Sequence, residues 1–169
     1  LLDARLVAGS SRPLADLMEP FWDSFPVGDF VITKIRERER FMARSHETPL
    51  VASPDLKDGA GGIRCVHTAG WLAMALGQRA PRLHAEMETV LKVRNLAHVL
   101  VGKKVEILSP GLQAKVADAL GITHAELMRQ LLSALDRNHE LYREAVGSLK
   151  EARYVLRPGV WAVHGEVRF

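Results

Sequence analysis

The sequence is poor in the features that mark several large classes of protein. It contains one cysteine, Cys65, which excludes a disulfide framework and fits a reducing compartment. No apolar run approaches the roughly 20 residues of a membrane span, and the start lacks the basic and then apolar stretches of a signal peptide. We therefore expect a cytoplasmic protein that has no membrane partner.

An excess of charge of one sign is also missing. The 23 basic and 20 acidic residues leave a net charge of +3, which is too small to predict a nucleic-acid partner. Hydrophobic residues make up 47% of the chain, enough to form a real core and to make wholesale disorder unexpected. The 169 residues fit one domain of ordinary size or slightly more.

Catalytic and metal-binding patterns are absent as well. The chain has no His-Glu-x-x-His motif, no His-Asp dipeptide of histidine/aspartate phosphohydrolases, and no Asp-x-Asp pair for two-metal nucleotidyl transfer. The pairs Glu37/Glu39 and Glu86/Glu88 are two residues apart, so their side chains point apart on a helix. We expect no catalytic residue and no metal site in this chain, and no activity from the chain alone.

Helical patterns fill most of the sequence. Apolar residues at helical spacing, together with capping residues, proline and glycine, predict helices over 1–8, 11–22, 30–46, 63–76, 81–101, 110–120 and from 124 onward. Pro20 predicts a kink or a break, and the mixed charges of 30–46 favour a solvated helix face. We predict an all-α bundle of about six helices over residues 1–153, followed by an extended or β-like tail over 154–169 with one or two strands.

The most distinctive stretch is residues 53–71, where three glycines in four residues precede a helical pattern. One interpretation is an anion site, because helix N-terminal N–H groups and the helix dipole attract anions and basic residues flank the turn. The other is a tight turn whose glycines allow close packing, and spacing alone favours it. The stretch is neither a Walker A loop nor a dinucleotide-binding fingerprint. Arg64 could lower the pKa of Cys65, but no base for a catalytic thiol is identifiable.

The same stretch resembles a known family. Residues 54–64, P-D-L-K-D-G-A-G-G-I-R, are similar to the most recognisable helical-domain motif of bacterial PII-protein uridylyltransferase/uridylyl-removing enzymes. Other segments resemble parts of that family in the same order along the chain. Residues 1–9 resemble the segment after the nucleotidyltransferase core, and residues 159–169 resemble the start of the linker to the hydrolase. Between them, further matches occur at Trp71, 93–98, 112–117 and 127–128.

The resemblance implies a helical domain between a nucleotidyltransferase core and a phosphohydrolase domain. In the family, the core uses Mg²⁺ and UTP to transfer UMP to the nitrogen-signalling PII protein, the hydrolase removes it, and ACT domains sense glutamine. The implied partners are the chain's own core and hydrolase domains and a PII-like protein. Because the chain begins with Leu1 and no methionine, we expect a piece of a longer protein.

The resemblance also suggests candidate residues for contact with the nucleotide or the core. A lysine or arginine beside the turn would contact the triphosphate or an acid of the core, and an arginine and a histidine one helical turn apart come next. The candidates are Lys57, Gly59, Gly61, Gly62, Arg64, Arg94 and His98. His67, one helical turn after the glycines, would also reach a ligand of the turn.

The sequence departs from the family pattern at two places. Cys65 stands where the family usually has aspartate, and the stretch between Trp71 and Arg94 is shorter than usual. Two alternatives therefore stay open: a non-catalytic helical interaction module of a signalling protein, and a relative of glutamine synthetase adenylyltransferase. A Gly-Ser…Asp-x-Asp segment encoded upstream would support the enzyme.

Overall fold

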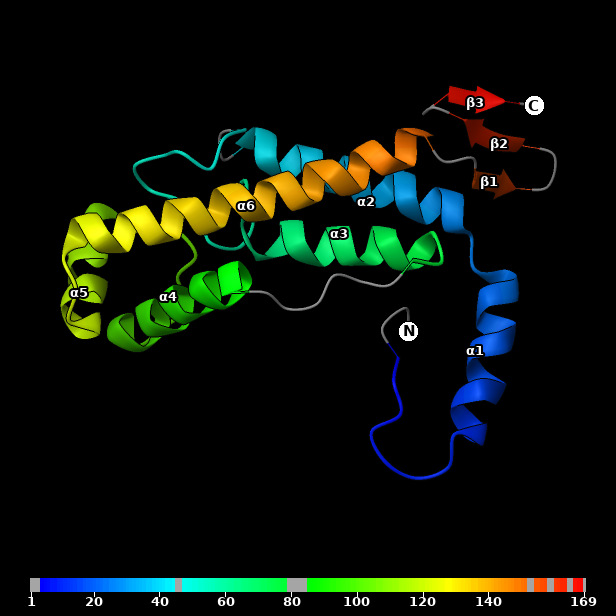
Figure 1. The fold of residues 1–169 in the computed structure, drawn as a ribbon, viewed down its shortest axis with the longest axis horizontal. Helices are drawn as coiled ribbons and strands as arrows, with labels where there is room; N and C mark the ends of the chain where they lie inside the picture. The colour runs from blue at the N-terminus through cyan, green and yellow to red at the C-terminus, as the bar shows by residue number, and fades with distance from the viewer. Residues whose placement is uncertain are drawn as a thin grey trace.

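The computed structural model describes residues 4–44, 47–78, 85–151, 154–157, 160–163 and 166–168. These residues form six helices, which confirms the predicted all-α bundle. The helices are α1 (Arg12–Ser24), α2 (Val27–Arg44), α3 (Ile63–Ala75), α4 (Ala85–Val101), α5 (Pro110–Leu120) and α6 (His124–Glu151). α6 is the longest helix and contacts α3, α4 and α5 along its length, while α2 contacts α3 (Figure 1).

The core has a main cluster and two smaller ones. The main cluster lies where α3, α4, α5 and α6 meet, and its fully buried residues include Val90, Val116, Leu131 and Leu135. A second cluster joins α2 to α3 and α6, and a third lies beside the glycine turn. Because α6 supplies residues to all three clusters, it fixes the remaining helices relative to one another.

Most helix ends agree with the sequence predictions. Gly77, Gly102 and Gly121 follow α3, α4 and α5 with φ of +70°, +69° and +67°, the left-handed conformation that ends helices. The amide of Glu126 donates to Thr123 Oγ1 over 3.1 Å at the start of α6, which is half of the predicted capping box. The predicted start of α4 at Pro81 lies outside the described residues.

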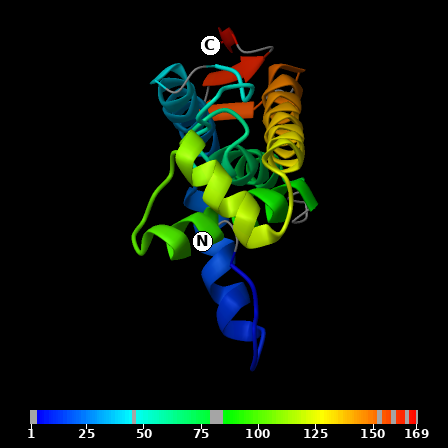
Figure 2. The same cartoon turned by 90° about the vertical axis from the view of Figure 1, so that its left-hand side faces the viewer.

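The N-terminal region differs from its prediction. Residues 4–8 contain no helix, and residues 5–8 are exposed, so the helix predicted there is wrong over the described residues, which lack the packing that stabilises a short helix. α1 continues through Pro20, so a break there is wrong, while the alternative of a kink stays a prediction. None of the α1 residues is buried, and the helix projects from the body (Figures 1 and 2).

The C-terminal tail forms a small antiparallel sheet rather than one or two strands. Its strands are β1 (Tyr154–Arg157), β2 (Val160–Val163) and β3 (Glu166–Arg168), in the order β1-β2-β3. Tyr154 pairs with Ala162, and Trp161 pairs with Arg168. Since β1 contacts α2, the tail packs on the bundle near the start of that helix (Figure 1). The division into domains at residue 153 stays a prediction.

Candidate functional site

The turn before α3 is fixed by its own backbone and by a distant segment. The Asp55 carboxylate accepts hydrogen bonds from the amides of Lys57 (2.9 Å) and Asp58 (2.8 Å), which is an Asx-turn. Asp55 also forms an antiparallel bridge with Ile107, and the Leu56 amide donates to the Glu106 carbonyl over 2.8 Å. Residues 54–56 are therefore held by the segment that joins α4 to α5.

The glycines allow this turn to approach α6 closely. Gly61 has φ of +73°, and a Cβ there would lie 1.8 Å from the carbonyl oxygen of Leu135. A Cβ at Gly59 or Gly62 would lie within 2.7 Å of a carbonyl oxygen of the turn itself. The side-chain amide of the fully buried Asn138 donates to the Gly61 carbonyl over 3.1 Å. The geometry thus gives the glycines the packing role that their spacing favours.

The first amides of α3 are already used. The Ile63 and Arg64 amides donate to the carbonyl oxygens of Leu56 and Lys57 over 3.0 and 3.1 Å. An anion therefore cannot take these N–H groups, as the helix N-terminus interpretation requires, without displacing the turn. Attraction for an anion must come from side chains instead.

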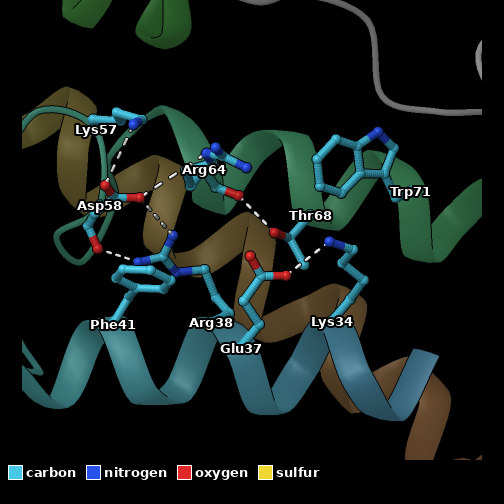
Figure 3. Close-up of a pocket in the computed structure, with 9 residues that line it drawn as sticks. All are labelled: Lys34, Glu37, Arg38, Phe41, Lys57, Asp58, Arg64, Thr68 and Trp71. Carbon is cyan, nitrogen blue, oxygen red and sulfur yellow. Dashed lines mark hydrogen bonds and ion pairs between the residues drawn. The ribbon is translucent and has the colours of Figure 1, made fainter. Parts of the chain in front are cut away.

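Such side chains line a cleft of about 230 Å³ between α2, the turn and α3. Four are cationic and two are acidic, which leaves a formal excess of two positive charges (Figure 3). The lining residues are Lys34, Glu37, Arg38, Phe41, Lys57, Asp58, Arg64, Thr68 and Trp71. We call this the cationic cleft.

Three of the cations point at one carboxylate, that of Asp58 (Figure 3). Arg38 Nη1 and Lys57 Nζ are each 3.7 Å from its oxygens, and Arg64 Nε is 4.0 Å away. These distances exceed the roughly 2.7–2.9 Å of a charge-assisted hydrogen bond. The Asp58 carboxylate therefore gathers the cations without binding any of them tightly.

Arg38 is the buried cation of the cleft. Its side chain is 2% exposed, one guanidinium nitrogen donates to the Asp58 carbonyl, and its Nε has no hydrogen-bond partner. The predicted solvated face of α2 is wrong at this residue. Val31, Arg38 and Met42 are all buried, and their spacing places them on the same stripe of the helix.

At the other end of the cleft, charges are paired more closely. Lys34 Nζ lies 2.7 Å from Glu37 Oε2, and this hydrogen bond holds the pKa of Glu37 below its usual value. The same ammonium lies 5.2 Å from the centre of the Trp71 ring, within the range of a cation–π contact. This end is therefore partly neutralised, and the unmatched positive charge lies towards Asp58.

Arg94 and His98 lie outside the cleft and support it. Arg94 forms two hydrogen bonds with Glu106, of 2.7 and 2.8 Å, and they lower the pKa of the Glu106 carboxyl. His98 Nε2 lies 2.8 Å from the carbonyl oxygen of Val105. Both residues thus fix the segment that pairs with residues 54–56. A role for either in ligand contact stays a prediction.

Cys65 is a core residue. Its side chain is fully buried with Met42, Ala60 and Tyr142, and burial raises the pKa of the thiol. This direction is opposite to the one predicted from the neighbouring Arg64. His67 is exposed and does not line the cationic cleft.

The described residues do not form a metal site. No three histidine, cysteine, aspartate or glutamate side chains among them lie close enough together to hold an ion. We therefore assign no Mg²⁺ ligand to these residues and no step in this chain to the ion. In the same part of the chain, no helix combines the length and apolar character needed to cross a membrane.

Comparisons with known proteins agree with the sequence resemblance. A family model described as GlnD PII-uridylyltransferase matches residues 29–85. Proteins named bifunctional uridylyltransferase/uridylyl-removing enzyme are 29% identical in Rhodopseudomonas palustris and 30% identical in a Bradyrhizobium species, each over 88% of this chain. The relative of the same name in Thiobacillus denitrificans is 27% identical over 86%.

The chain covers only part of these relatives. It spans 18% of the Rhodopseudomonas and Bradyrhizobium proteins and 19% of the Thiobacillus protein. No solved structure gives a significant match. The similarity therefore concerns one region of a longer kind of protein, and this region includes the whole cationic cleft, whose residues lie between positions 34 and 71.

Proposed function

Because this chain is a relative of the PII-uridylyltransferases, we propose that it serves as the helical domain of a nucleotidyltransferase that moves UMP from UTP to a PII-like signalling protein. In this role the chain packs against a nucleotidyltransferase core and supports the bound nucleotide. The core supplies the catalytic carboxylates together with Mg²⁺, and this chain supplies positive charge. A following phosphohydrolase domain and a cytoplasmic location belong to the same proposal.

The observation that carries the proposal is the cationic cleft within the matched region. Nucleotidyl transfer develops negative charge on phosphate oxygens, and fixed cations stabilise such charge. Lys57 and Arg64 belong to the motif that resembles the family, and both line the cleft. Their side chains are 27% and 39% exposed, so either can reach a triphosphate or an acid of the core.

The test uses the full-length protein that contains this chain. Lys57→Ala and Arg64→Ala should each lower the rate of UMP transfer from Mg-UTP to a PII protein by about tenfold or more, the worth of one charge-assisted hydrogen bond. Arg40→Ala is the matched control, because Arg40 is an exposed α2 residue outside the cleft. Thermal unfolding reports stability. Unchanged transfer and stability in both cleft variants would contradict the proposal.

A second candidate function is a non-catalytic helical interaction module. It is favoured by the buried Cys65, which replaces the usual aspartate of the family motif and packs in the core. The coding sequence upstream of Leu1 separates the two, since a Gly-Ser…Asp-x-Asp segment supports the enzyme. Replacing UTP by ATP and the PII protein by glutamine synthetase in the transfer assay tests the adenylyltransferase alternative.

A further inference from the structure

We infer that the cationic cleft is itself a binding site for an oligophosphate, either free pyrophosphate or the phosphates of a nucleotide, and that the Asp58 carboxylate competes with this ligand for the cations. The inference deepens the proposed function and rests on it for the source of the ligand. It also names a residue, Arg38, that the family motif does not include.

The state of Arg38 is the first argument. A buried guanidinium needs hydrogen-bonded partners to offset the loss of water. Here one guanidinium nitrogen donates to the Asp58 carbonyl, but the closest carboxylate oxygen is 3.7 Å away, and Nε has no partner. Arginine presents parallel N–H groups that match phosphate oxygens. Because Arg38 lines the cleft without a carboxylate within hydrogen-bond distance, an oxyanion there would bring negative charge close to a cation that the protein pairs only weakly.

The charge and size of the cleft distinguish an oligophosphate from a carboxylate of another domain. The cations come from both walls, Lys34 and Arg38 from α2 and Lys57 and Arg64 from the opposite side (Figure 3). One carboxylate would neutralise half of the formal excess of two charges, whereas pyrophosphate neutralises all of it. The cavity of about 230 Å³ holds about eight water-sized groups at roughly 30 Å³ each, comparable with the size of pyrophosphate.

The position of Asp58 is the third argument. Its carboxylate lies among three cations at 3.7–4.0 Å, where the ligand oxygens would bind. The backbone of the turn does not depend on this side chain, because the Asp55 carboxylate holds the amides of Lys57 and Asp58. Asp58→Asn should therefore remove the competing charge and keep the shape of the loop.

The experiment is an NMR titration of this chain with sodium pyrophosphate at constant ionic strength and with EDTA present. We expect saturable shifts at the amides of Lys57, Asp58 and Arg64. Lys57→Gln and Arg64→Gln should each weaken the affinity about tenfold, the typical worth of one charge-assisted hydrogen bond. Arg38→Lys keeps the positive charge but removes the parallel N–H groups of the guanidinium, so it should also weaken the affinity for pyrophosphate. The NMR spectrum of this variant shows whether the fold is retained.

Matched variants separate the cleft from general electrostatics. Arg40→Gln removes an exposed charge of α2 outside the cleft and should leave the affinity unchanged. Asp58→Asn should tighten pyrophosphate binding about tenfold, whereas Glu140→Gln, which removes the same charge from an exposed pair on α6, should not. The inference is overturned if no saturable shifts occur, or if Arg40→Gln and Arg64→Gln lower the affinity for pyrophosphate equally. The role of Asp58 is overturned if Asp58→Asn leaves that affinity unchanged or weakens it.

Three ligands separate recognition of the phosphates from recognition of the base, and the relative affinities of pyrophosphate and UTP show which source of phosphate binds more tightly. If phosphate is the recognised group, pyrophosphate and UTP both bind and uridine does not. Binding of uridine with an affinity similar to that of UTP would overturn the inference, since the base would then be recognised. If pyrophosphate causes no shifts but the full-length Lys57 and Arg64 variants lose UMP transfer, the phosphate site is refuted and the proposed function stands.

If pyrophosphate binds but the full-length protein transfers no UMP, the proposed function is refuted and the phosphate site stands.

Discussion

Gly61 and Gly147 show that the same residue type has opposite effects at two positions. Gly61 has a left-handed backbone, and an added Cβ would meet the backbone of α6. Gly147 lies inside α6 with nothing within 4 Å of an added Cβ. The conformational freedom of glycine is therefore needed at the first position and only weakens the helix at the second.

These differences predict opposite changes in stability. Gly61→Ala should lower the free energy of unfolding by about 2–4 kcal/mol through strain and overlap with Leu135. Gly147→Ala should raise it by about 0.5–1 kcal/mol. Urea unfolding followed by circular dichroism measures both. A Gly61→Ala protein as stable as the parent would mean that the turn does not approach α6 as described.

Burial of Cys65 predicts a slow reaction with alkylating reagents. The thiol is fully buried, and its pKa is raised by burial, so little thiolate is present near neutral pH. In the folded protein at pH 8, iodoacetamide should label Cys65 at least about tenfold more slowly than in urea-unfolded protein. Mass spectrometry of timed samples follows the labelling. Equal rates in the two states would show that the thiol is accessible.

Residue identity alone did not reveal Arg38. The charged residues of 30–46 predicted a solvated face, since arginine is seldom fully buried. The helical spacing places Arg38 on the same stripe as the buried Val31 and Met42. The charge of arginine nevertheless favours an exposed position. Only the packing of α2 against α3 and the nearby turn shows that a cation belongs there, because those partners lie far apart in the sequence.

The segment between α4 and α5 is the element that supports the turn. Arg94 and Glu106 form a pair whose side chains are 18% and 19% exposed, and His98 contacts the Val105 carbonyl. Residues 106–108 in turn pair with 54–56. We therefore expect changes in this pair to affect the stability of the turn as well as the connection itself.

The pair predicts a pH-dependent contribution to stability. The folded-state pKa of Glu106 is lowered, chiefly by the hydrogen bonds from Arg94. Its contribution is therefore present above the ordinary glutamate pKa of about 4.3 and is lost as the pH falls through the lowered value. At pH 7, Glu106→Gln should destabilise the protein by about 1–2 kcal/mol, and the difference from the parent should vanish in strong acid.

Urea unfolding at a series of pH values measures this effect. Glu140→Gln is the control, because Glu140 and Arg137 form an exposed pair with side chains 50% and 60% exposed. Solvent screens such an exposed pair, so its contribution to stability is small. A Glu106→Gln penalty that persisted at low pH would assign its cause to packing rather than to the charge.

Helices and their ends could be predicted because their signals are local. The apolar stripe and the Thr123 cap identified α6, and glycines marked the ends of α3, α4 and α5. The pairing of residues 54–56 with 106–108 had no such signal, since it joins positions about fifty residues apart. α1 also continues through Pro20 without the predicted break, although proline removes one hydrogen bond of the helix.

For the whole molecule, α1 and α6 mark two extremes of stability. α1 buries none of its residues, and a helix of this length is marginal without packing. α6 supplies residues to all three core clusters. Hydrogen exchange followed by mass spectrometry should find α1 amides exchanging at least about a hundredfold faster than those of residues 127–142. Equal protection would show that α1 is stabilised by contacts absent from this structure.

The overall architecture was easier to predict than the cationic cleft. Periodicity and the family resemblance indicated an all-α bundle and singled out Lys57 and Arg64, which do line the cleft. Arg94 and His98 were predicted together with them, but they contact the segment that joins α4 to α5 and so support the turn without lining the cleft. The difference arises because a motif identifies residues that matter together, while only the three-dimensional arrangement separates those that present charge from those that hold the backbone.

The turn divides its tasks between two sets of residues, and this has a consequence for how the protein can change. Asp55 and the glycines set the path of the backbone, while the side chains of Lys57, Asp58 and Arg64 line the cleft. New side chains at these three positions can therefore alter which anion is recognised without requiring a new loop. Evolution or protein engineering can therefore change the specificity of the cleft by single substitutions that leave the backbone of the turn unchanged.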